Sequence, residues 1–251
     1  MSITSFTKKQ ILEGLAKYEP SISNRLRILY VQEHIDKNSF EHACKLYSNL
    51  KGASYDDVII IEKFHGSHDK LLPLVSNTSF ETPIGTVEAN DVLRNDFCDE
   101  DDDFFLDDAG YREDMAIYDQ LMMLQCVLTD FKAVSIQVVD MRTSIIRELT
   151  GALAELMRER NGLVIICADA SECDDQKLQS IQQAVDNREH SRLMNYLNTG
   201  DAGINGAGPL AAGILLADNW ELETKLGISD VKGSPFLSGY SCLTKYEKAT
   251  V

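Results

Sequence analysis

Apolar residues recur along the chain in short β-branched runs, most of them followed by a longer stretch with helical spacing. The clearest runs cover residues 26–31, 56–64, 133–139 and 162–168. Continuous apolar runs of this length are typical of strands that are buried on both faces of a parallel sheet. The pattern therefore predicts an α/β fold, with a single domain whose mainly parallel central sheet is flanked by helices.

The stretches with helical spacing lie before and between these runs. They are expected over residues 7–18, 40–50, about 142–160 and about 174–199. Two of them carry capping signals, because Thr7 precedes the first helix and Asp174 precedes the last. Residues 1–25 are therefore expected to form an N-terminal helical extension of the single domain, which spans residues 1–251.

An acidic stretch, CDEDDDFFLDDAG, interrupts the alternation from Cys98 onward. A charge run of this kind is typical of a solvated loop, so we expect an acidic loop over residues 95–110. A cation-binding loop is the functional alternative, but the spacing does not match an EF-hand. The rings of Phe97, Phe104 and Phe105 would be exposed unless they hold the loop against the domain.

Composition narrows the class of protein. The chain has 251 residues, 44% of them hydrophobic, and a formal net charge of -16. This charge repels phosphate, so neither nucleic acid nor an anionic membrane is an expected partner. No apolar run approaches the roughly 18 residues of a membrane span, and no secretory signal is present at the N-terminus. The six cysteines show no CxxC spacing, which argues against disulfides or a thiolate zinc site. We expect a cytoplasmic protein.

Polar residues follow each of the four predicted strands, where ligands bind in open α/β sheets. Two histidines, His34 and His65, lie directly after strands, and Asp169 lies after another. A single histidine in a surface loop is more often solvated than liganded, but the shared position of the pair favours a functional role. For Asp169 a helix cap, an acid or base and a metal ligand all remain open.

The order of the strand-end motifs resembles the Memo family, which includes AmmeMemoRadiSam system protein B. The segment VQEHIDKNSF (31–40) stands where the family has PHAGY, and EKFHG (62–66) stands where it has GPSHH. The turn ETPIG (81–85) matches the family's TPLG at the correct spacing, and CADASE (167–172) replaces SSDFSH. The resemblance covers nearly the whole chain from about residue 26 and implies a fold similar to class III extradiol dioxygenases.

Several positions depart from the family pattern. The family's metal position is formed by two histidines and a cysteine, which correspond here to His34, His65 and Asn205. A neutral asparagine is a weak ligand for a transition metal. Glu172 stands where the family has a histidine. Glu172 first of all, or else Asp169 or Asp114, would complete a site with two histidines and one carboxylate.

The resemblance thus implies a Memo-like protein with a degenerate metal site that acts as a binding or scaffold protein, with no classical dioxygenase activity. The alternative is a non-haem metal-dependent oxidoreductase in which His34, His65, Asp169 and Glu172 are catalytic. Iron or copper is the expected metal if the site is functional, and no cofactor is expected otherwise. The partner would be an unidentified small molecule or protein. A metal-independent hydrolase is not supported, because the chain has no GxSxG motif.

Overall fold

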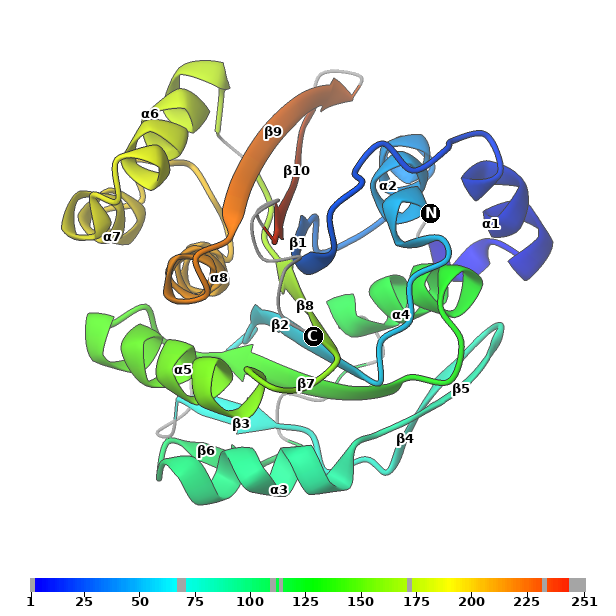
Figure 1. Ribbon diagram of the computed structural model, residues 1–251, viewed down its shortest axis with the longest axis horizontal. Helices are drawn as coiled ribbons and strands as arrows, with labels where there is room; N and C mark the ends of the chain where they lie inside the picture. Colours follow the sequence, from blue (N-terminus) through cyan, green and yellow to red (C-terminus); the bar gives the residue numbers. More distant parts are fainter. Residues whose placement is uncertain are drawn as a thin grey trace.

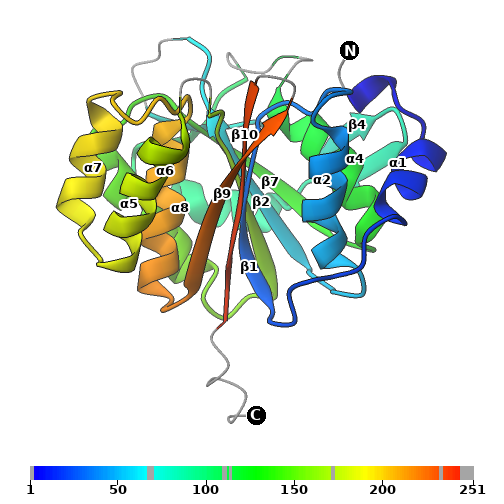
Figure 2. The same cartoon turned by 90° about the horizontal axis from the view of Figure 1, so that it is seen from above.

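A twisted eight-stranded sheet runs through the centre of the molecule, with helices on both faces (Figures 1 and 2). The structure is a computed structural model, which describes residues 3–66, 71–108, 112, 115–170, 173–231 and 234–243. The strand order is β6-β3-β7-β2-β8-β1-β10-β9. The four predicted apolar runs form its parallel centre, as β1 (Leu26–Val31), β2 (Asp57–Lys63), β7 (Lys132–Val138) and β8 (Gly162–Cys167). The predicted α/β class is confirmed.

Shorter or mixed-polarity strands flank this centre. On one side lie β3 (Leu72–Leu74) and β6 (Phe104–Leu106). On the other side, β10 (Ser234–Cys242) pairs antiparallel with both β1 and β9 (Glu223–Val231). A separate hairpin consists of β4 (Ser79–Thr82) and β5 (Gly85–Glu88). The sequence interpretation did not identify these six strands.

Alternate side chains of the central strands bury against two groups of helices. On β2, Ile59 and Ile61 face one core, and Val58 and Ile60 face the other. The first core is covered by α3 (Asp91–Glu100), α5 (Thr143–Leu156), α6 (Asp175–Asp186), α7 (His190–Asn198) and α8 (Ala207–Asn219). The second is covered by α1 (Lys8–Leu15), α2 (Phe40–Tyr47) and α4 (Ala116–Val127), with short 3-10 turns at Ile3–Ser5 and Ser48–Leu50.

Both predicted helix caps are present. The Thr7 side chain accepts a hydrogen bond from the Gln10 backbone N–H, and the Asp174 side chain accepts one from that of Lys177. The single helix expected over residues 174–199 is wrong, because the chain divides there into α6 and α7. The break lies at Arg188, whose φ of 54° is incompatible with a right-handed helix.

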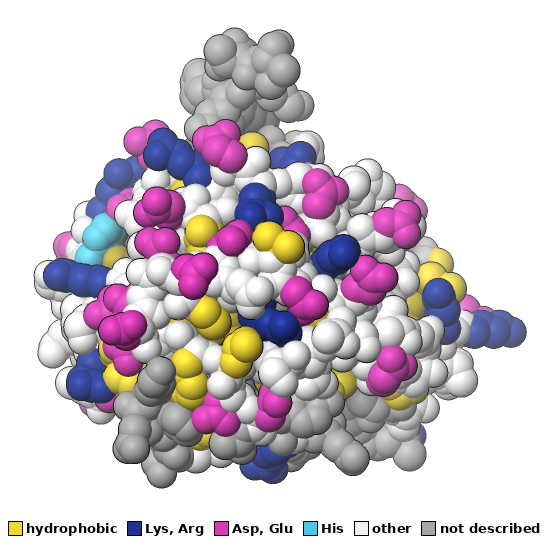
Figure 3. Space-filling model, turned by 90° about the horizontal axis from the view of Figure 1, so that it is seen from below, with side chains coloured by type: hydrophobic (Ala, Val, Ile, Leu, Met, Phe, Trp, Pro, Cys, Tyr) yellow, Lys and Arg dark blue, Asp and Glu magenta, His cyan; other side chains and the backbone are white. Residues whose placement is uncertain are grey.

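The acidic segment is more ordered than expected. Residues 91–100 form α3 and residues 104–106 form an edge strand of the main sheet, so the expected loop over residues 95–110 is wrong at both places. The rings of Phe97 and Phe104 are buried, with centroids 5.4 Å apart. Burial of these rings anchors the segment, while Asp99 and Glu100 remain exposed. The underside of the molecule shows acidic and basic side chains interspersed (Figure 3).

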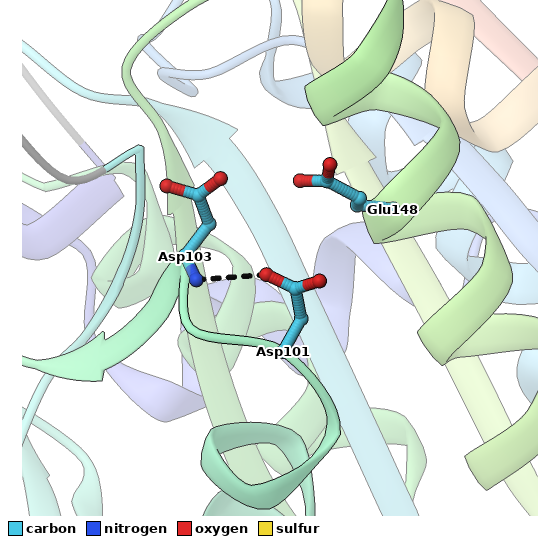
Figure 4. Close-up of side chains that lie close together, drawn as sticks. All are labelled: Asp101, Asp103 and Glu148. Carbon is cyan, nitrogen blue, oxygen red and sulfur yellow. Dashed lines mark hydrogen bonds between the residues drawn. The ribbon is translucent and has the colours of Figure 1, made fainter.

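Three half-buried carboxyl groups meet beside this segment (Figure 4). Asp101, Asp103 and Glu148 offer oxygens within 4.8 Å of one another, and the Asp103 backbone N–H donates to Asp101 Oδ1 at 2.9 Å. Burial, together with the charges of Asp101 and Asp103, raises the pKa of Glu148. Exposed acidic groups like these are common without a bound cation. No helix in the described part of the chain is long and apolar enough to cross a membrane.

Candidate functional site

The carboxyl ends of β1, β2 and β8 bring several of the predicted site residues to one edge of the sheet. Asp169 follows β8, and its side-chain Oδ1 accepts a hydrogen bond of 3.0 Å from the backbone N–H of Glu33. Asp169 and Asn205 exchange two backbone hydrogen bonds, both of 2.8 Å. The loop after β1, the end of β8 and the start of α8 are therefore joined around Asp169.

His34 is held by a carboxylate from α4. Its Nδ1 lies 3.6 Å from Oδ2 of the buried Asp119, and half of the imidazole side chain (50%) is exposed. The same Oδ2 atom accepts a hydrogen bond of 2.8 Å from the Ile35 backbone N–H. The interaction with Asp119 raises the pKa of His34, although burial opposes the shift. The side chain is thus orientated and partly accessible to a ligand.

His65 faces a different carboxylate. Its Nε2 lies 3.8 Å from Oε2 of Glu33, and 44% of the His65 side chain is exposed. Glu33 is buried, and its Oε1 atom has no hydrogen-bond partner among the described residues. Burial and the negative charge of Asp169 raise the pKa of Glu33 to about 7. A carboxyl group of this kind can hold or release a proton near neutral pH.

Asn205, at the position of the family cysteine, is engaged by a lysine. The Lys63 ammonium donates a hydrogen bond of 2.8 Å to Asn205 Oδ1. The next residue, Gly206, has a left-handed φ of 77° and begins the turn into α8. A Cβ atom there would lie 2.9 Å from the Cys167 carbonyl oxygen and 3.3 Å from Glu33 Oε1. Glycine is therefore required both by the backbone angle and by the close approach of β8.

The N-terminal half of α4 supports the site from the other core. Glu62 Oε2 accepts a hydrogen bond of 2.8 Å from the Ala116 backbone N–H, at the start of the helix. Glu62 is fully buried, and burial raises its pKa to about 8. Gln120 Nε2 donates to the backbone carbonyl oxygens of Gln32 and Glu33 at 3.0 and 2.9 Å. These contacts fix the segment that carries His34.

Sequence reasoning did not assign roles to five of these side chains. They are Glu33, Glu62, Lys63, Asp119 and Gln120. The sequence does contain a signal for such residues, which is a polar residue inside or directly after an otherwise apolar run, as in DVIIIEK and AIYDQLMMLQ. Burial of such residues demands a partner, but the sequence does not say which one.

Three of the expected site residues, His34, His65 and Asp169, do not have ligand atoms that all lie within 4.8 Å of one another. Within the described residues, only Asp101, Asp103 and Glu148 bring three or more His, Cys, Asp or Glu ligand atoms within 4.8 Å of one another. His34 and His65, together with Asp169, are not such a group. Glu172, the first candidate for the third ligand, lies outside the described residues, as does Asp114.

An α/β domain with a polar site at the carboxyl ends of its parallel strands agrees with the comparisons to known proteins. A family model described as "Memo-like protein" matches residues 5–226, and the chain belongs to this family. The resemblance identified from the sequence motifs is thereby confirmed.

Relatives are similar at low identity. A MEMO1 family protein of Thermotoga neapolitana is 29% identical over 166 residues, which are 61% of this chain and 58% of that protein. One from Nitrosopumilus maritimus is 23% identical over 51% of this chain and 46% of its own length. The matches thus span about half the length of these relatives. An uncharacterized protein, JW3007 from Escherichia coli K12, has a similar fold, with a TM-score of 0.55 and 13% identity over 86% of this chain and 99% of its own.

Proposed function

We propose that this chain is a Memo-like protein whose site binds a ligand without a resident transition metal, so that it acts as a binding or scaffold protein. The hydrogen bond between Lys63 Nζ and Asn205 Oδ1 carries the proposal. This bond engages the side-chain oxygen of Asn205, which stands at the position of the family cysteine. A metal ligated by Asn205 would have to displace this ammonium group.

The charge of Lys63 opposes a metal at this place. Two unit charges 4 Å apart repel by about 1 kcal/mol in water and by about 4 kcal/mol near a protein surface, and a divalent ion doubles this repulsion. The family cysteine would offset such a cost through an anionic, strongly donating thiolate. The neutral amide of Asn205 offers neither charge nor strong donation.

The remaining donors support the same proposal. His34 Nδ1 is directed to Asp119 and His65 Nε2 to Glu33, at 3.6 and 3.8 Å. Each imidazole therefore has its own carboxyl group as a neighbour. The half-exposed rings and the Lys63 ammonium would act on a ligand by donating hydrogen bonds, and the buried carboxylates would keep the rings in place.

One observation favours the rival function. Histidines that bind metals commonly pair their other nitrogen with a carboxylate, as His34 and His65 do here. A non-haem oxidoreductase would use His34 and His65 with Asp169 or Glu172 as the third ligand, and iron or copper as the metal. Lys63 favours the metal-free site, because its ammonium group is already hydrogen-bonded to Asn205 at the position of the family's third ligand.

Metal analysis distinguishes the two functions. The protein is expressed without a metal-affinity tag, and its iron, copper and zinc contents are measured before and after anaerobic iron loading. We expect far less than one metal per chain in both cases. Stoichiometric metal that is lost in His34→Ala or His65→Ala, but retained in the control His190→Ala, would overturn the proposal.

We also propose a cellular compartment and a kind of partner for the protein. All six cysteines are free thiols, four of them buried, which supports a reducing compartment. We place the protein in the cytoplasm. The formal charge of -16 disfavours nucleic acid and anionic membranes, so the partner is a small molecule or another protein.

A further inference from the structure

A second groove lies away from the strand ends, between α5, α7 and α8, which lie together on one face of the sheet (Figure 1). It encloses about 460 Å³, which is within the usual range for small-molecule sites. Residues one or two turns apart on three helix faces line it, among them Arg147 and Gly151 of α5, Met194 and Asn195 of α7, and Leu215 and Asn219 of α8.

None of the described residues that line the groove is a carboxylate, although the chain carries 40 acidic residues. Four other grooves in the described part of the chain each include at least one, contributed by Glu41, Glu88, Asp130 or Asp201. Among the described residues of the lining, Arg147 carries a permanent charge, which is positive. In a protein of this net charge, an acid-free groove that carries an arginine favours anions over cations.

Acidic side chains next to the groove in sequence are already paired. Asp218 lies 3.1 Å from Arg188 Nε and 3.2 Å from His190 Nε2, and Glu189 lies 2.8 Å from Arg192 Nη1. Arg147, by contrast, is exposed and forms no ion pair with any described residue. A planar guanidinium in this state is suited to a carboxylate or phosphate, with which it forms two parallel hydrogen bonds.

The uncharged part of the lining suits hydroxyl groups. The side-chain amides of Asn195, Asn198 and Asn219 form no hydrogen bonds within the described residues, so their donors and acceptors are available. Met194 and Leu215 supply an apolar surface for a carbon skeleton. The side chain of Glu189, the N-cap residue of α7, makes no capping hydrogen bond, which leaves free backbone N–H groups near His190 and Ser191.

Gly151 leaves open space on the α5 side of the groove. A Cβ atom at this position would contact nothing within 4 Å, although glycine inside a helix lowers helix stability. From these observations we propose that the groove between α5, α7 and α8 is a second binding site, for a small polyhydroxylated organic anion such as a sugar phosphate or a sugar acid.

Calorimetric titration with glucose 6-phosphate, gluconate and glucose tests this site. At least one of the two anions should bind with a Kd of about 1 mM or tighter, and glucose should bind at least about tenfold more weakly. The two anions distinguish a phosphate from a carboxylate head group. No binding of either anion at about 5 mM would overturn the proposal.

Three variants locate the binding. Arg147→Ala should weaken it roughly 10- to 100-fold, because a charge-assisted hydrogen bond is lost. Gly151→Leu should abolish it by filling the open space, and circular dichroism checks that the variant is folded. Arg158→Ala removes the same charge from an exposed position outside the groove and should leave binding unchanged. Anion affinity that is the same in Arg147→Ala as in the wild type would contradict the assignment, whatever the behaviour of Gly151→Leu.

Discussion

Asp119 Oδ2 lies 3.6 Å from His34 Nδ1 and accepts a hydrogen bond of 2.8 Å from the Ile35 backbone N–H. One buried oxygen of α4 therefore holds both the imidazole and the main chain directly after β1. Because Asp119 is 84 residues from Ile35 in sequence, the position of His34 depends on the packing of α4 against the sheet. The ring is fixed before any ligand arrives.

Asp119→Asn should lower the pKa of His34, since the carboxylate raises it in the wild type. Protonated His34 stabilises the fold below its unfolded pKa, and this contribution is lost as the pH rises through the folded value. The destabilisation caused by Asp119→Asn should therefore be largest at acidic pH and should shrink above the folded pKa. NMR titration of the His34 ring measures the shift directly. Asp218→Asn, which removes the carboxylate beside His190, should leave the His34 titration unchanged.

Glu62→Gln should make stability less dependent on pH. Burial raises the pKa of Glu62 from 4.5 to about 8, so between these values the folded protein retains a proton that the unfolded chain releases. Stability should fall with rising pH in this window, with a contribution of at most about 1.4 kcal/mol per pH unit from one group. Glutamine keeps an oxygen for the Ala116 N–H and removes the titration.

Urea unfolding at several pH values measures this effect. The slope of the free energy of unfolding against pH should be shallower in Glu62→Gln than in the wild type. Glu155→Gln, at an exposed position on α5, is the control and should not change the slope. Equal slopes for the wild type and Glu62→Gln would show that Glu62 does not hold the proton.

Gly206→Ala should destabilise the protein by more than Gly200→Ala. Both glycines have a left-handed φ, 77° and 79°, which costs another residue about 1–2 kcal/mol. Only at Gly206 would the new Cβ meet the backbone, at 2.9 Å from the Cys167 carbonyl oxygen, whereas at Gly200 it would contact nothing within 4 Å. The difference between the two free energies of unfolding measures the close approach of α8 to β8. Equal losses of stability in the two variants would indicate that the turn before α8 relaxes without an energetic cost.

The parallel centre of the sheet was predictable because its four strands are largely apolar runs that require burial on both faces. The antiparallel pair β9 and β10 was not, because residues such as Gly227, Ser229, Ser238 and Gly239 interrupt the apolar pattern. Tertiary contacts stabilise this pair instead. Gln182 of α6 accepts a hydrogen bond of 3.0 Å from the Leu226 N–H of the edge strand β9. Long-range pairing of this kind leaves no periodic signal in a sequence.

The candidate site, too, was only partly predictable from the sequence. The rule that ligands bind at the ends of parallel strands proposed His34, His65 and Asp169 as candidates. It did not reveal that Lys63 would contact Asn205, because these residues are 142 positions apart and the contact depends on how β2 and the start of α8 meet. Glu62 was unremarked because it extends a buried strand, where only the structure shows that its carboxyl group caps α4.

The most direct test of the metal-free site is a titration with Co(II) of the wild type, Asn205→Cys and Lys63→Met/Asn205→Cys. The double variant restores the family thiolate and removes the ammonium, so we expect it to bind one Co(II) tightly, with thiolate-to-cobalt charge-transfer absorption. Asn205→Cys alone should bind more weakly, and the wild type weakest of the three. Tight stoichiometric binding of Co(II) by the wild type, lost in His34→Ala and His65→Ala, would contradict the account.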